Sequence, residues 1–262
     1  MNTKAIVLHT LKYGDASVIV DMLTQAKGRV SFFVNIPKTS KGRFKKQYFQ
    51  PLTILDVTYD HRERTSLQRL RDVRIATPFT SLPFDPIKLS ISLFLAEFLY
   101  NVTRDEQSNI PLYQYVENSL LWLDGTQRSC ANFHLVFMMR LSRFIGFYPN
   151  LEGPGSRSLT LNPSARGEGS LESRGGLFFD LREASFVTAP PTHPDFLEPA
   201  EAELIHTLMR MDYNTMHLFH LSRAERNRFT DLLLQYYRVH IPQMPELHSL
   251  SVVREISNAS VD

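Results

Sequence analysis

Cysteine is almost absent from this sequence. The chain has 262 residues and a single cysteine, Cys130. One thiol excludes an intramolecular disulfide and every site that needs two thiolates from one chain, including the four-ligand zinc ribbons. Because cysteine is among the most buried residue types, we expect Cys130 to be a small core residue rather than a reactive thiol.

Long apolar runs are also missing. The longest uncharged stretch of the first helical segment, Leu89 to Ala96, has 8 residues, whereas a membrane span needs about 20. Near the start only Ala5 to Leu8 are continuously apolar, which is too short for the core of a secretion signal. We therefore expect no membrane contact and a cytoplasmic location.

Sequence signatures of enzymes are missing as well. There is no His-Glu-x-x-His, no Gly-x-Ser-x-Gly and no phosphate loop with its lysine. Glu203 and His206 have the spacing of a carboxylate metal bundle but occur once, and His217 and His220 lack a third ligand. We therefore expect no catalytic residue, no metal and no cofactor.

Acidic residues are absent between Met22 and Leu55. Residues 1 to 78 contain 14 Lys and Arg against 6 Asp and Glu, a net of +8, and residues 79 to 262 contain 15 against 21, a net of −6. A face that served only for solubility would mix the two signs. The imbalance favours a polyanion ligand over a solvated basic face.

The candidate phosphate contacts are the basic residues of this first part of the chain. Tyr48 and Phe49 are candidates for stacking on bases, although Phe49 fits a barrel core equally well. The predicted DNA-binding residues are Lys27, Arg29, Lys38, Lys41, Arg43, Lys45, Lys46, Arg69 and Arg71. Arg69 and Arg71 belong to a second basic cluster, which also contains Arg62, Arg64 and Arg74.

The first 76 residues contain runs rich in β-branched and aromatic residues, which are typical of β-strands. Five short strands in this length predict a small closed barrel, and the oligonucleotide-binding (OB) barrel is a five-stranded fold whose sheet face and loops hold nucleic acid. We assign residues 1–78 to such a domain. The predicted strands are Thr3–Leu11, Ala16–Leu23, Arg29–Ile36, Tyr48–Tyr59 and Leu67–Ala76.

From Pro78 onward the apolar period becomes helical, and residues 79–262 are predicted to form an all-α domain. Asp85-Pro86 reads as an N-cap followed by a first-turn proline, and Ser222 with Glu225 has capping-box spacing. Residues 153–176 are rich in Gly and Ser and read as a loop within a 153–196 insertion. The predicted helices are Ile87–Val102, Leu112–Leu123, Ala131–Phe147, Pro199–Met211 and Arg223–His240.

Four segments, in this order along the chain, carry a resemblance to a known family. They are Ala5–Leu8 with Tyr13–Ser17 and Gly28–Val30, the basic stretch Lys38–Lys46 with Phe49–Leu52, Phe133–Leu151, and Tyr236–His240 with Leu247–Leu250. The chain resembles bacterial RecO, a family of recombination-mediator and DNA-annealing proteins. The resemblance covers nearly the whole chain apart from residues 153–176.

One feature of that family is missing here. Many relatives carry a four-cysteine zinc site after a Pro-x-Leu segment, which is Pro149-Asn150-Leu151 in this chain. Here residues 150–157 and 175–180 contain no cysteine. We therefore expect a degenerate zinc-ribbon-like insertion in which Gly176–Phe179 retains a hairpin held by packing.

The resemblance implies a DNA repair function without chemistry on the DNA. It implies binding of single- and double-stranded DNA, annealing of complementary strands, and loading of recombinase on strands coated by single-stranded DNA-binding protein (SSB), in the cytoplasm at the nucleoid. The implied partners are RecR and the acidic C-terminal tail of SSB, with RecF and RecA as further candidates. Candidate tail-binding residues are Arg128, Arg140 and Arg143 beside Phe137, Met139 or Phe144, although this stretch also fits an ordinary amphipathic helix.

Two other functions stay open from the residues alone. The same basic strands would suit an RNA-binding barrel protein. A structural adaptor, whose basic half meets an acidic protein, would show the same charge division.

Overall fold

A computed structural model of the chain describes residues 1–36, 44–150 and 176–256. The chain divides into two compact units. The first unit comprises residues 1–134 and 244–262, and the second comprises residues 135–243.

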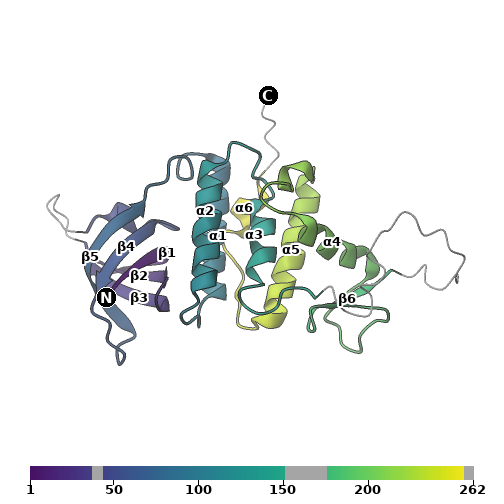
Figure 1. Cartoon of the computed structure of the whole chain (residues 1–262), viewed down its shortest axis with the longest axis horizontal. Coiled ribbons are helices and arrows are strands. Elements are labelled where there is room, and N and C mark those ends of the chain that lie inside the picture. The colour runs from purple at the N-terminus through teal and green to yellow at the C-terminus, as the bar shows by residue number, and fades with distance from the viewer. Residues whose placement is uncertain (37–43, 151–175, 257–262) are drawn as a thin grey trace, which may run out of the picture. The chain divides into compact units, whose positions relative to one another are not determined.

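The first unit begins with a closed barrel, as predicted (Figure 1). The order around the barrel is β1-β2-β3-β5-β4, and β4 pairs again with β1 to close it. A register shift between Val7 and His9 lets the long first strand pair with β2 on one side and β4 on the other. The strands are β1 (Asn2–Tyr13), β2 (Ser17–Thr24), β3 (Gly28–Asn35), β4 (Ile54–Tyr59) and β5 (Leu67–Thr77).

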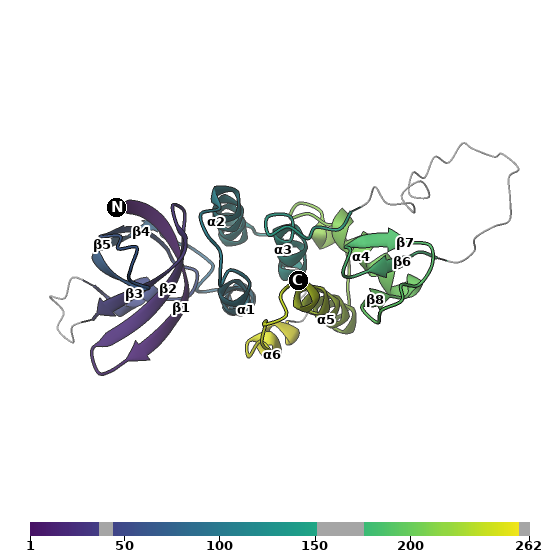
Figure 2. The same cartoon turned by 90° about the horizontal axis from the view of Figure 1, so that it is seen from below.

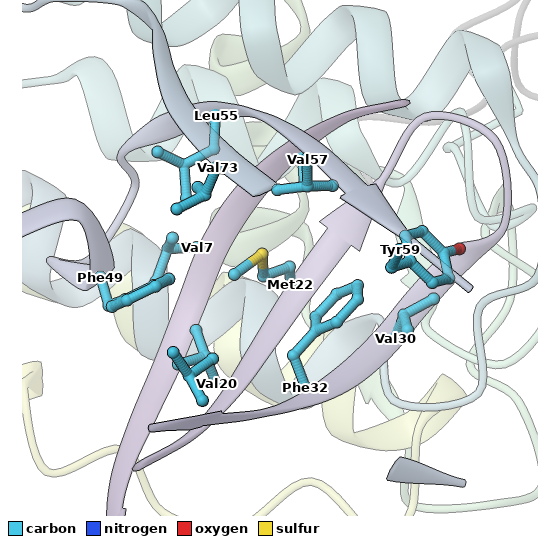
Figure 3. Packing of buried hydrophobic residues seen from close by; sticks show 12 residues of the cluster. Val7, Val20, Met22, Val30, Phe32, Phe49, Leu55, Val57, Tyr59 and Val73 are labelled. Atoms are coloured by element: carbon cyan, nitrogen blue, oxygen red, sulfur yellow. The ribbon is translucent and has the colours of Figure 1, made fainter. Parts of the chain in front are cut away.

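Alternate strand residues fill the barrel, because successive side chains of a strand point to opposite faces. Phe32 and Tyr59 meet edge to face at its centre, with their ring centroids 5.0 Å apart. Figure 3 shows Phe49 in this core beside Val7. Phe49 is 2% exposed, so of the two roles left open for it, a core residue or a base-stacking one, the structure has the core residue.

The predicted fourth strand begins too early. Residues Lys46–Phe49 form a short 3-10 helix, η1, and β4 begins only at Ile54. Pro51 has no N–H to give to a strand ladder. Leu52 adopts a positive φ of 62° and donates its N–H to the Val7 carbonyl at 2.7 Å, so this segment crosses the barrel instead of pairing along it.

Two helices of the first unit follow the barrel, and α1 contacts β1 (Figure 2). They are α1 (Pro86–Val102) and α2 (Ile110–Gly125). The Asp85 cap is confirmed, since its carboxylate accepts the N–H groups of Ile87 and Lys88 at 2.8 and 3.0 Å. A third, unpredicted helix, α6 (Leu250–Arg254), contacts α1, and Glu97 accepts the N–H groups of His248 and Ser249.

Asp124, at the end of α2, fixes the segment that leaves the barrel. Its carboxylate accepts three backbone N–H groups of residues 80–82 at 2.7 to 3.1 Å. Burial opposes ionisation, but these bonds outweigh it and lower the pKa of Asp124 to about 2. The Lys88 ammonium donates to the Asp124 and Thr126 carbonyls, so the first turn of α1 is joined to the same corner.

We expect Asp124→Asn to lower the free energy of unfolding by about 2 kcal/mol at pH 7. A lowered pKa stabilises the fold above the unfolded value near 4, and this contribution disappears as the pH falls from about 4 to 2. Urea unfolding of both proteins across this range measures it. A difference between wild type and variant that does not shrink toward pH 2 contradicts the assignment.

The second unit contains α3 (Phe133–Leu141, from residue 135 on), α4 (Pro199–Arg210) and α5 (Arg223–His240). The Tyr237 hydroxyl donates to the Met138 carbonyl at 2.7 Å and so joins α5 to α3. The capping box of Ser222 and Glu225 is confirmed. Helix α3 ends before our predicted Phe147, because the chain turns at Gly146, where φ is +95° and the Gly146 and Phe147 N–H groups bond the Ser142 carbonyl.

A small three-stranded sheet stands where we expected a hairpin. Its order is β7-β6-β8, with β6 (Phe178–Asp180), β7 (Ser185–Val187) and β8 (Phe196–Leu197). Asp180 accepts the N–H groups of Arg182 and Glu183 and lies 3.2 Å from the His193 ring, so its oxygens are used by the turn itself. The predicted loop at 153–176 lies outside the described residues except for Gly176.

Cys130 is 6% exposed, and burial raises the pKa of its thiol to about 11. The prediction of an unreactive core cysteine is therefore confirmed. In the described ranges, no helix is both long enough and apolar enough to cross a membrane.

Candidate nucleic-acid interface

The outer face of strands β1, β2, β3 and β5 carries a row of side chains that the barrel core does not use. Register places Leu11 opposite Ile19, Ile19 opposite Phe33, and Phe33 beside Arg69. Leu11 is 53% exposed, and Ile19 and Phe33 are half-buried. Together they form an apolar strip that ends in an arginine.

Tyr13 extends this strip at the end of β1. Its ring meets the Phe33 ring edge to face, with centroids 5.9 Å apart, and Tyr13 is 58% exposed. A partly exposed aromatic pair on a sheet is a surface on which unpaired bases can stack. The alternation of Val30, Phe32 and Val34 in the sequence already places Phe33 on the outside, but we did not assign it a role.

The loop between β4 and β5, residues 60–66, borders the start of β3, because β5 begins at Leu67 opposite Ser31. The buried Gln68 side chain shapes this loop. Its amide oxygen accepts the Arg62 N–H at 2.9 Å, and its amide nitrogen donates to the Arg62 carbonyl at 3.0 Å and to the Thr65 carbonyl. Arg62 and Arg64 therefore extend from a backbone that is already ordered, which lowers the entropic cost of binding.

The arginines of this region fall into two groups. Arg62, Arg64 and Arg69 are exposed, and the described part of the chain offers their guanidinium groups no acidic partner. Arg71 pairs with Asp60 at 2.7 Å, and Arg74 pairs with Asp56 at 3.1 Å. Exposed ion pairs of this kind contribute little stability. The carboxylate of each pair nevertheless offsets the positive charge of its arginine, which is then less available to a phosphate.

Arg29, one of our predicted phosphate contacts, is in a different position. Its side chain is 11% exposed, its guanidinium lies 4.3 Å from the centre of the Tyr100 ring, and it donates to the Tyr100 carbonyl at 2.9 Å. Asp21 lies 3.5 Å from the same group. A buried guanidinium with these partners cannot reach a phosphate, so we remove Arg29 from the contacting set.

The other predicted contacts lie at the barrel's margins. Lys27 is exposed in the turn between β2 and β3, and Lys45 and Lys46 are exposed at η1. Tyr48 is half-buried and packs against the barrel core. The predicted contacts Lys38, Lys41 and Arg43 lie outside the described residues.

The predicted tail-binding residues are not equivalent. Phe137 and Met139 are buried, at 0% and 1% exposure, and cannot line a surface pocket. Arg140 donates to the Met211 carbonyl at 3.1 Å, whereas Arg143 is exposed and lies over the Tyr148 ring at 4.5 Å. These two arginines therefore make separate contacts.

Arg128 belongs to the first unit and is exposed. Its N–H bonds the Thr126 hydroxyl at 3.2 Å, and the Thr126 carbonyl accepts from Lys88 of α1 at 2.8 Å. Phe84, just before α1, is 78% exposed, and Leu89 in its first turn is 41% exposed. Arg128, Phe84 and Leu89 therefore belong to two segments that the bond between Lys88 and Thr126 joins.

The four residues weighed for metal binding do not share one site, and the Nδ1 atom of His217 is buried without a hydrogen-bond partner in the described part of the chain. Glu203 and His220 are exposed, and the His206 ring packs against Phe186 with centroids 4.5 Å apart. Among the residues that the structure describes, no group of three or more His, Cys, Asp or Glu side chains could hold a metal ion.

The barrel, its exposed aromatic pair and its bordering arginines define the class as an oligonucleotide-binding barrel protein with an added helical region. Residues 1–79 match the family model described as "Recombination protein O N terminal", and residues 83–250 match "Recombination protein O C terminal". The chain belongs to the RecO family. Its role is therefore in DNA repair and recombination.

Individual relatives agree over nearly their full length. The chain is 46% identical to the DNA repair protein RecO of Phocaeicola vulgatus over 97% of this chain and 98% of the relative. It is 45% identical to the protein of the same name from Bacteroides fragilis, with the same two coverages. A third, from Christiangramia forsetii, is 33% identical over 98% of each chain.

Proposed function

We propose that this protein binds single- and double-stranded DNA on the outer face of β1, β2, β3 and β5 and anneals complementary strands. The observation that carries the proposal is the pair of exposed Tyr13 and half-buried Phe33, flanked by arginines without acidic partners among the described residues. The aromatic pair would stack on bases, and Arg62, Arg64 and Arg69 would neutralise phosphates.

Annealing on this face needs no acid, base or nucleophile. Two strands repel one another through their phosphates, and the protein has to offset that charge while it leaves base edges accessible for pairing. Stacking through ring faces meets the second need, because it leaves the hydrogen-bonding edges of a base exposed. The proposal therefore contains no catalytic step.

The proposed cellular task is to load recombinase on single strands coated by SSB, at the nucleoid. RecR is the proposed main partner, with RecF and RecA as further ones. We further propose that the acidic, apolar-ended tail of SSB docks at the corner of the first unit that carries Arg128, Phe84 and Leu89. A cation and exposed apolar side chains on two joined segments match such a tail, and Arg143 remains the alternative position.

The test follows annealing of two complementary labelled oligonucleotides, bare and coated with the cognate SSB, by wild type, Arg128→Glu and Arg143→Glu. We expect wild type to anneal both substrates. Arg128→Glu should anneal bare strands within about 2-fold of wild type but lose at least about 10-fold on coated strands, because it places a like charge opposite the tail.

Each other outcome has a definite meaning. Loss with Arg143→Glu alone moves the tail site to the second unit. Equal annealing of RNA and DNA without any effect of SSB supports an RNA-binding protein. Failure of wild type to bind labelled oligonucleotides at low salt rejects the DNA-binding proposal and favours a protein adaptor.

A further inference from the structure

An acidic side chain lies within the proposed DNA-binding face. Asp21 is on β2 opposite Ser31, two residues from Ile19 on the same outer side of the strand. Alternate residues of a strand are about 7 Å apart, so this carboxylate is one step from the strip that contains Phe33. A bare negative charge here would repel the phosphates of a strand stacked on Tyr13 and Phe33.

Asp21 is ionised. Burial raises the pKa of a carboxyl group, but the nearby His9 ring, the hydrogen bond from Ser31 and the charge of Arg29 outweigh burial here and lower it. The side chain is 12% exposed, with its oxygens 3.5 Å from the Arg29 guanidinium and 3.7 Å from the His9 ring. The protein therefore keeps a permanent charge at this place and covers it.

Arg29 is the group that covers the charge. It is held between Asp21 and Tyr100, near the end of α1, where it contacts both the ring and the carbonyl of the tyrosine. The backbone N–H of Arg29 also donates to the Glu106 carbonyl at 2.9 Å. Its guanidinium thus has fixed partners on the barrel and on the following helical segment, and none of its contacts depends on DNA.

We propose that Arg29 is a positioning residue for DNA binding, which raises affinity by neutralising Asp21 beneath the DNA-binding face and makes no contact with a phosphate itself. This inference rests on the proposed function. It differs from a direct contact in one measurable respect, because only residues that neutralise phosphates release counterions and contribute to the salt dependence of binding.

The test is a double-mutant cycle on single-stranded DNA affinity, with Arg29→Met, Asp21→Asn and the double variant, measured from 50 to 200 mM salt. We expect Arg29→Met to bind about 10-fold more weakly. Asp21→Asn should bind at least as tightly as wild type, and the double variant should return to within about 2-fold of wild type. The log–log salt slope should be the same in the double variant and in wild type.

Other results overturn the inference in recognisable ways. If Arg29 touches a phosphate, the double variant stays weak and its slope falls by about 0.7. If Arg29 matters only for folding, Arg29→Lys, which keeps the charge but loses the planar fork, unfolds at the same urea concentration as Arg29→Met and binds as weakly. If wild type itself does not bind DNA, the proposed function fails instead.

Discussion

Replacing Arg62, Arg64 and Arg69 by glutamine is expected to weaken single-stranded DNA binding about 100-fold at 0.1 M salt. Each phosphate contact on a single strand contributes about 0.7 to the log–log salt slope, so three lost contacts reduce the slope by about 2. At 0.1 M salt the same change is about two powers of ten in affinity. Fluorescence anisotropy of a labelled oligonucleotide, titrated at several salt concentrations, measures both quantities.

The matched control makes the same change of net charge in the second unit, with Arg210→Gln, Arg223→Gln and Arg238→Gln. We expect its affinity to remain within about 3-fold of wild type, because these arginines are not part of the proposed face and salt screens exposed charges. A second control, Arg71→Gln with Asp60→Asn, removes an exposed pair at no change of net charge. If the controls lose as much affinity as the test variant, the protein binds DNA through net charge and not through this face.

Composition predicted the ligand class better than it predicted the contacts. The excess of Lys and Arg in the first 78 residues identified a basic barrel. Which cations are available depends on cross-strand register, since Asp56 lies opposite Arg74 and Asp21 lies opposite Ser31, beside Arg29. Asp21 and Arg29 are 8 residues apart in the sequence, and Asp56 and Arg74 are 18 apart. No local pattern therefore reveals that Arg29 and Arg74 are already paired.

Local signals were reliable where local physics decides the structure. The Asp85-Pro86 cap and the capping box at Ser222 depend on residues within one helical turn, and both form as predicted. The strand prediction for Tyr48–Thr53 was wrong although the composition of this segment is typical of a strand. Pro51 cannot donate to a ladder, and Leu52 bonds Val7, which is distant in the sequence. Alternation along β3 indicates the outer face for Phe33, but its ring partner Tyr13 comes from another strand, so no local pattern reveals the pair.

Replacing Gly28 by alanine is expected to lower the free energy of unfolding of the first unit by at least about 3 kcal/mol. Gly28 has a φ of +68°, which costs an alanine roughly 1–2 kcal/mol. A Cβ at this place would also lie 2.2 Å from the Gln107 carbonyl oxygen and 2.3 Å from that of Glu106. The backbone must then move apart, and the bond from the Arg29 N–H to Glu106 is lost at a cost of about 1 kcal/mol.

Gly14→Ala is the control that separates the two causes, because Gly14 has nearly the same φ, +73°, and a Cβ there meets nothing within 4 Å. We expect it to lose only the roughly 1–2 kcal/mol of backbone strain. Urea unfolding of the two variants therefore measures the clash as a difference. Equal losses would mean that residues 106–107 do not pack against Gly28 in solution. A larger loss at Gly28, together with weaker DNA binding of the folded fraction, would show that the contact between the barrel and the segment after α1 also holds Arg29 over Asp21.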